Sequence, residues 1–78
     1  MKSALYEALK TFEERLHTAF PGAMFRLIDP FEGHDAAVEV TLPLREITWC
    51  ARMKLAEIAA ALEEEYDVYI GLLTKTAA

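Results

Sequence analysis

Apolar side chains in the first twenty residues recur at the spacing of one helical face. They fall at alternating intervals of four and three residues: Leu5, Leu9, Phe12, Leu16 and Ala19. We therefore predict a helix over about residues 3–20 with Ser3 as its N-cap, because a serine oxygen can accept a hydrogen bond from the first turn. Pro21 and Gly22 end this helix, since proline cannot continue a helix and glycine turns freely.

The next two segments alternate between the two sides of an extended chain, which is the period of a β-strand. They predict strands over about residues 24–29 and 36–42, joined by a hairpin loop of turn-forming residues. In the first strand Phe25 and Leu27 share one side. In the second, the inward positions are Val38, Val40 and Leu42, and the outward positions are Glu39 and Thr41.

The remaining chain predicts a second helix over about residues 44–65, with Pro43 in its first turn, and a strand over about 67–73. The strand is apolar on both sides, which are Val68, Ile70 and Leu72 on one and Tyr69, Gly71 and Leu73 on the other. We therefore expect it inside the sheet or at a covered edge. Residues 74–78 are predicted to be a frayed tail.

These elements predict one α+β domain over residues 1–78 with the order α-β-β-α-β. Both helices are expected on one face of a three-stranded sheet, as a two-layer sandwich. The order is that of a ferredoxin-like fold lacking its first strand. Because folds of this class host many unrelated functions, the topology does not identify what the domain does.

The predicted second helix carries two apolar stripes. One faces the sheet and consists of Leu44, Ile47, Ala51, Leu55, Ile58 and Leu62. The other, here called the outer stripe, consists of Trp49, Met53, Ala56 and Ala60. At about 100° per residue the outer stripe lies roughly 150° around the helix from the first. Charged residues border it, with Arg45, Arg52 and Glu63 on one side and Glu46, Glu57 and Glu64 on the other.

A helix in a two-layer sandwich needs only one apolar side, so the outer stripe is the candidate interaction site. Trp and Met are enriched in interface centres, and charges such as Arg52 and Glu57 are typical of an interface rim. Antiparallel pairing of this helix with itself would form a two-fold interface. The alternatives are cover by the first helix or the C-terminal tail, and simple exposure.

The sheet offers a second route to assembly. Its face without helices is expected to expose apolar side chains, which are Met24, Ile28, Tyr69 and Leu73. Face-to-face or edge-to-edge pairing of two sheets would cover them. Both routes predict a homo-oligomer, with a dimer favoured, and the sequence does not choose between them.

Composition narrows the partners and the setting. The net charge of −5 disfavours binding to nucleic acids and to anionic membranes, whose phosphates repel acidic surfaces. The chain has a single cysteine, Cys50, so it forms no internal disulfide, and together with the lack of a signal peptide this predicts a cytoplasmic location. No apolar run approaches the roughly 20 residues that a membrane span needs.

Candidate chemistry is sparse. The hairpin loop gathers four groups able to bind a metal, Asp29, Glu32, His34 and Asp35, but their spacing matches no known metal loop and favours an ordinary turn. Cys50 is expected to be a buried or half-buried structural residue, and His17 to interact with the C-terminus of the first helix. The run Glu63–Glu65 opposes the dipole of its own helix and is expected to be solvated. We thus expect no catalytic residue, metal or cofactor.

The sequence favours a non-enzymatic protein-interaction module that self-associates and binds another protein. One alternative is an acidic inhibitor or antitoxin-like protein that blocks a basic partner, motivated by the net charge of −5. Another is a small-ligand sensor or enzyme whose site forms at an oligomer interface, with Cys50, His34 and the tyrosines as candidate groups.

Overall fold

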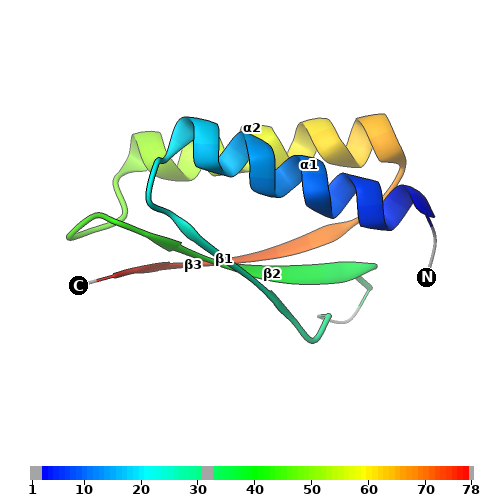
Figure 1. Ribbon diagram of the computed structural model, residues 1–78, viewed down its shortest axis with the longest axis horizontal. Coiled ribbons are helices and arrows are strands. Elements are labelled where there is room, and N and C mark those ends of the chain that lie inside the picture. Colours follow the sequence, from blue (N-terminus) through cyan, green and yellow to red (C-terminus); the bar gives the residue numbers. More distant parts are fainter. Residues whose placement is uncertain (1–2, 31–32, 78) are drawn as a thin grey trace.

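The computed structural model describes residues 3–30 and 33–77, and in this part of the chain five elements occur in the predicted order. They are α1 (Ser3–Ala19), β1 (Met24–Ile28), β2 (Ala36–Leu42), α2 (Trp49–Tyr66) and β3 (Ile70–Thr76). The two helices lie side by side over one face of the sheet (Figure 1). The predicted two-layer α+β sandwich is confirmed.

The sheet has the strand order β1-β2-β3. β1 pairs with β2 antiparallel, with Phe25 opposite Val40 and Leu27 opposite Val38. β3 pairs with β2 in parallel, with Leu72 also opposite Val38. In a ferredoxin-like split βαβ unit another strand separates the two strands that a helix connects. Here β2 and β3, which α2 connects, are direct neighbours, so β3 is an edge strand of the described sheet rather than an inner one.

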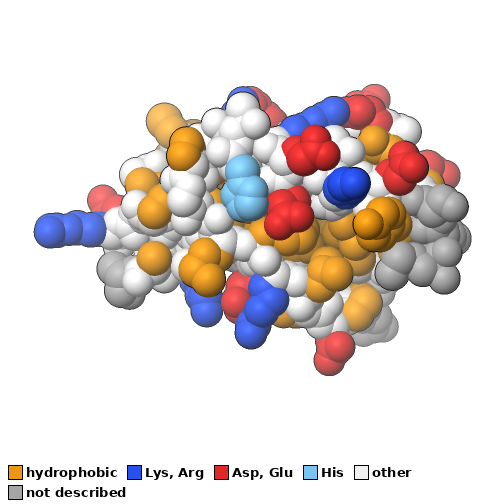
Figure 2. All heavy atoms as spheres, in the orientation of Figure 1, with side chains coloured by type: hydrophobic (Ala, Val, Ile, Leu, Met, Phe, Trp, Pro, Cys, Tyr) orange, Lys and Arg blue, Asp and Glu red, His pale blue; other side chains and the backbone are white. Residues whose placement is uncertain are grey.

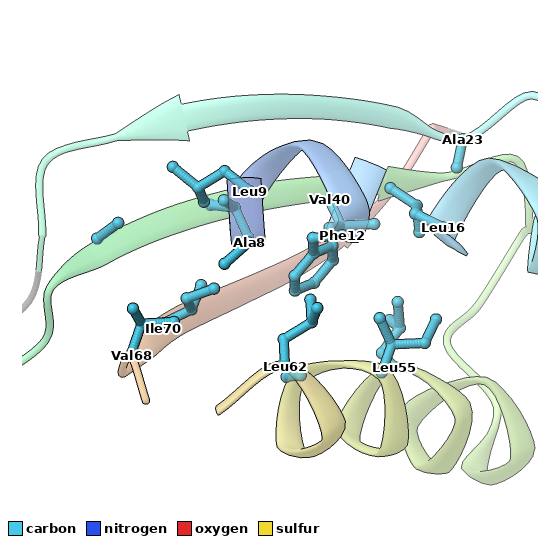
Figure 3. Close-up of a cluster of buried hydrophobic side chains, with 14 of the residues drawn as sticks. Ala8, Leu9, Phe12, Leu16, Ala23, Val40, Leu55, Leu62, Val68 and Ile70 are labelled. Atoms are coloured by element: carbon cyan, nitrogen blue, oxygen red, sulfur yellow. The ribbon is translucent and has the colours of Figure 1, made fainter. Parts of the chain in front are cut away.

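The core lies between the sheet and both helices. Phe12 from α1 and Leu62 from α2 point toward each other beneath the sheet residue Val40 (Figure 3). The Phe12 ring also packs on Phe25 of β1, with ring centroids 5.6 Å apart. Among the described residues no polar or charged side chain is buried. Apolar packing on one side of each helix therefore holds the two layers together.

The predicted start of the second helix is wrong. α2 begins at Trp49, not near Pro43, because Thr48 caps it: this residue is extended (φ −76°, ψ 163°) and its Oγ1 accepts a hydrogen bond of 3.1 Å from the Ala51 N–H. Leu44 and Ile47 still pack against the core, but from the segment that precedes the helix. Their helical spacing was therefore coincidental.

The last strand is also displaced from its predicted range. It begins at Ile70 rather than residue 67, because Asp67 adopts a left-handed conformation (φ 53°) that ends α2, and Val68 is buried before the strand starts. Residues 74–76, predicted as part of a frayed tail, extend the ladder until Thr76 lies opposite Leu42. The parallel pairing uses the full length of β2, which local sequence does not reveal.

Smaller differences concern the ends of the other elements. Ser3, predicted to be an N-cap, is itself the first helical residue of α1, and the residues before it lie outside the described part of the chain. α1 ends at Ala19 and β1 at Ile28, each one residue short of the predicted end. Helix ends commonly fray by one or two residues, so these differences do not alter how the elements pack.

The cap at Thr48 gives a direct test of where α2 begins. We expect Thr48→Ala to lower the free energy of unfolding by about 1 kcal/mol, because the Ala51 N–H loses its acceptor. Thr48→Ser keeps a hydroxyl and is expected to stay within about 0.5 kcal/mol of the wild type. Urea denaturation followed by circular dichroism measures both. Stabilisation by alanine would instead place Thr48 inside a helix that starts earlier.

Candidate functional site

The outer stripe of α2 is exposed in the structure. The Trp49 side chain is 74% exposed and Met53 is 44% exposed, while Ala56 and Ala60 also face solvent. The buried residues of the helix lie on its other side: Ala51, Leu55, Ile58, Ala59 and Leu62. Neither α1 nor the described C-terminal residues cover the stripe, so the alternative of intramolecular cover is wrong.

The position of α1 explains why Trp49 is uncovered. A surface groove of about 580 Å³ separates the two helices, and α2 contributes Lys54 and Ile58 to its walls. At about 100° per residue these two positions lie roughly 150° around the helix from the outer stripe. α1 therefore packs against the side of α2 that points away from Trp49.

Two polar contacts join α2 to α1 beside the apolar core. Arg15 of α1 donates two hydrogen bonds to the Glu65 carboxylate, at 2.8 and 3.1 Å. One turn away along α1, the Thr11 and Tyr66 hydroxyls are 3.1 Å apart and hydrogen-bonded. Both contacts join the C-terminal end of α2 to the middle of α1. They supplement the apolar packing that keeps one side of α2 on the core and leaves the outer stripe toward solvent.

The same ion pair changes the titration of its two partners. The hydrogen bond from Arg15 lowers the pKa of Glu65 below its ordinary value, and the hydrogen bond to Glu65 raises the pKa of Arg15. Glu65 is thus paired rather than simply solvated as predicted. Glu64 is exposed and Glu63 is half-buried, and neither is in an ion pair within the described residues.

The charged border of the outer stripe is shorter than predicted. Arg52 and Glu57 lie on α2 and are exposed, as an interface rim requires. Arg45 and Glu46 precede the helix, because α2 begins only at Trp49, so they do not extend these two rows of charges. The rim on the helix itself therefore consists of Arg52 and Glu63 on one side and Glu57 and Glu64 on the other.

The sheet face without helices is less apolar than predicted. Glu39 of the central strand lies between two cations. Its Oε1 is 3.1 Å from Nη2 of Arg26 on β1 and 3.3 Å from Nζ of Lys75 on β3. Met24 and Leu73 are exposed on this face, beside the charges. Burying the face against another apolar surface would remove water from all three charges at once.

Sequence reasoning missed a groove between α1 and β1. Figure 2 shows hydrophobic side chains gathered there, and the groove encloses about 260 Å³. Tyr6 and Leu27 line it and are 59% and 55% exposed. Leu27 points to the helix side as predicted, but α1 covers only Phe25 beside it. The feature of the sequence that could have indicated this groove was Tyr6, a large aromatic residue beside the buried face of α1.

The hairpin loop has a structural role in the described residues. The Asp35 carboxylate accepts a hydrogen bond of 2.7 Å from the Tyr69 N–H, and the His34 ring stacks on Tyr69 with centroids 4.0 Å apart. These contacts tie the loop to the start of β3. No three metal-binding side chains converge within residues 3–30 and 33–77, and Glu32 lies outside those ranges.

The two remaining candidate residues are Cys50 and His17, and the prediction that Cys50 is buried or half-buried is wrong. Cys50 is exposed, not buried, because it lies in the first turn of α2 away from the side that meets the core. His17 in the last turn of α1 donates from Nε2 to the Ala23 carbonyl oxygen at 3.1 Å. This contact is with the turn that follows α1 rather than with the helix C-terminus that was expected, and it gives His17 a structural role.

Comparison with family models, curated proteins and solved structures finds no match for this chain. None of the described helices combines the length and the apolar character that crossing a membrane requires. The function is therefore inferred from the exposed surfaces of the molecule.

The Arg15–Glu65 pair predicts a pH dependence of stability. Because the folded-state pKa of Glu65 is lowered, its stabilisation is present above about pH 4.3, the ordinary glutamate value, and is lost as pH falls through the folded pKa. We expect Glu65→Gln to be less stable than the wild type at pH 7 and nearly equal to it at pH 2.5. The measurement is urea denaturation at both pH values.

Glu64→Gln is the matched control, since Glu64 is the exposed neighbour without an ion pair in the described residues. Its stability should differ little from the wild type at either pH. A deficit of Glu65→Gln that is equally large at pH 2.5 would contradict an electrostatic role for the pair.

Proposed function

We propose that this chain is a small non-enzymatic protein-interaction module that self-associates through α2 and binds another protein. The observation that carries the proposal is the exposed outer stripe, with Trp49 at its N-terminal end. Single exposed apolar residues are ordinary, but Trp49, Met53, Ala56 and Ala60 form one continuous row between two rows of charge.

The charges on the sheet favour the helix over the sheet as the self-association surface. Face-to-face pairing of two sheets would bury the ion pairs that Glu39 forms with Arg26 and Lys75. Desolvating an ion pair can cost more than its attraction returns. Pairing through the outer stripe buries no charge at its centre, because the rim residues Arg52 and Glu57 remain beside it in water.

The area available supports a reversible rather than a permanent dimer. A buried Trp side chain removes roughly 150–250 Å² from water, and at about 25 cal/mol per Å² two Trp49 side chains contribute on the order of 8–12 kcal/mol. Association itself costs an estimated 4–15 kcal/mol. Because the two ranges overlap, burial of the two Trp49 side chains only about offsets the cost of association. Met53 and the alanines supply the remaining free energy, and we expect a dissociation constant in the micromolar range.

Two further features support the rest of the proposal. The groove between α1 and β1 lies away from the outer stripe and keeps Tyr6 and Leu27 available for a protein partner when α2 is paired. The exposed thiol of Cys50, the single cysteine, favours a reducing setting such as the cytoplasm, since an oxidising one would promote unwanted pairing.

Two methionines allow the helix and the sheet routes to be compared. Met53 lies on the outer stripe and Met24 on the free face of the sheet, and both are exposed. We expect the wild type to self-associate at tens of micromolar in sedimentation velocity. Met53→Glu should then be monomeric, because a carboxylate would be buried in the contact, whereas Met24→Glu should assemble like the wild type.

Circular dichroism of both variants checks that the fold is retained. A wild type that stays monomeric to several hundred micromolar would refute self-association. Dissociation by Met24→Glu with no effect of Met53→Glu would move the contact to the sheet.

A further inference from the structure

Side-chain size is unevenly distributed along the outer stripe. The two large residues, Trp49 and Met53, lie in the N-terminal half of the stripe, and the two small ones, Ala56 and Ala60, lie in its C-terminal half. Two helices pack closely where large side chains meet small ones. A surface that is large at one end and small at the other therefore complements a reversed copy of itself.

Charge is distributed along the helix in the same way. Among the rim residues, Arg52 lies in the N-terminal half of α2 and Glu57 at its middle, whereas Glu63 and Glu64 lie in the C-terminal half. Acids at a helix C-terminus oppose the dipole of their own helix, so Glu63 and Glu64 are placed unfavourably within one chain. An acid is favourable near the N-terminus of another helix. A reversed second copy brings that N-terminus to them.

From these two gradients we infer that the partner of the outer stripe is the same stripe of a second copy, with the two α2 helices antiparallel about a two-fold axis. This inference rests on the proposed self-association and specifies its geometry. Trp49 and Met53 of each copy pack on Ala56 and Ala60 of the other. A parallel pair would place the two Trp49 side chains together and leave the alanines facing each other across a gap.

The rim residues then acquire defined partners. At about 100° per residue, Arg52 and Glu63 lie within about 20° of each other on one side of the stripe, and Glu57 and Glu64 lie on the other side. Turning one helix end over end leaves each side facing the same side of its partner. In the register that sets Trp49 against Ala60, Arg52 of each copy lies on the same side as Glu63 of the other and about six residues, or roughly 9 Å, from it along the helices, a separation that the two long side chains bridge to form two symmetry-related ion pairs. In a parallel pair Arg52 would face Glu57 instead.

Charge reversal distinguishes the two arrangements. We expect Arg52→Glu to weaken the dimer at least about tenfold at low salt, because it replaces two attractive contacts with two repulsive ones. Adding Glu63→Arg to this variant should restore the affinity to within about threefold of the wild type. Adding Glu57→Arg instead should not restore it. Sedimentation at several concentrations gives the dissociation constants, and circular dichroism confirms that each variant is folded.

Each result bears on a different claim. Rescue by Glu63→Arg alone supports the antiparallel pair. A wild-type dimer that is insensitive to Arg52→Glu, or that only Glu57→Arg rescues, overturns the antiparallel geometry and leaves self-association standing. A wild type that is monomeric throughout overturns both the geometry and the proposed self-association.

Discussion

The packing of α1 against α2 over one face of the sheet determines what the rest of the molecule presents to its surroundings. Phe12, Leu55 and Leu62 fill the space between the layers and leave each helix covered on one side only. The Arg15–Glu65 ion pair and the Thr11–Tyr66 hydrogen bond also join the two helices beside this apolar core. A sandwich of two layers has no third layer to cover Trp49, so the outer stripe is exposed because of the architecture.

The two uncovered surfaces are the helix-free face of the sheet and the outer stripe of α2, and they differ in where their charges lie. On the sheet, Glu39 holds Arg26 and Lys75 across the free face, and these charges keep that face hydrated despite Met24 and Leu73. On α2, the charges stand beside the apolar row rather than within it. Surfaces with a dry centre and a charged rim are typical of protein contacts, and this difference supports the helix as the association surface.

The sequence was sufficient for the order of elements and for the two sides of α2, because both follow from periodic apolar positions. It failed where periodicity is ambiguous or where a distant partner decides. Leu44 and Ile47 fit the helical period yet pack from the segment before Thr48, whose cap starts the helix. The shift of β3 follows from its parallel register with β2, a pairing between residues more than thirty positions apart.

The exposure of Cys50 and the groove beside Leu27 could not be predicted for a related reason. Cys50 depends on where α2 starts, and that start was placed too early. Leu27 points to the helix side of β1 as its alternation indicates, but how far α1 reaches over an edge strand is set by packing around Phe12 and Phe25. Pattern gives the side that a residue faces, whereas tertiary packing decides whether anything covers it.

Fluorescence of Trp49 tests the central claim most directly, because it is the chain's single tryptophan and lies on the outer stripe. If the stripe is covered by a second copy, emission should be blue-shifted and protected from acrylamide at high protein concentration. Dilution through the micromolar range should then shift it to the red and make it accessible. Emission and quenching that do not change with concentration would contradict the account.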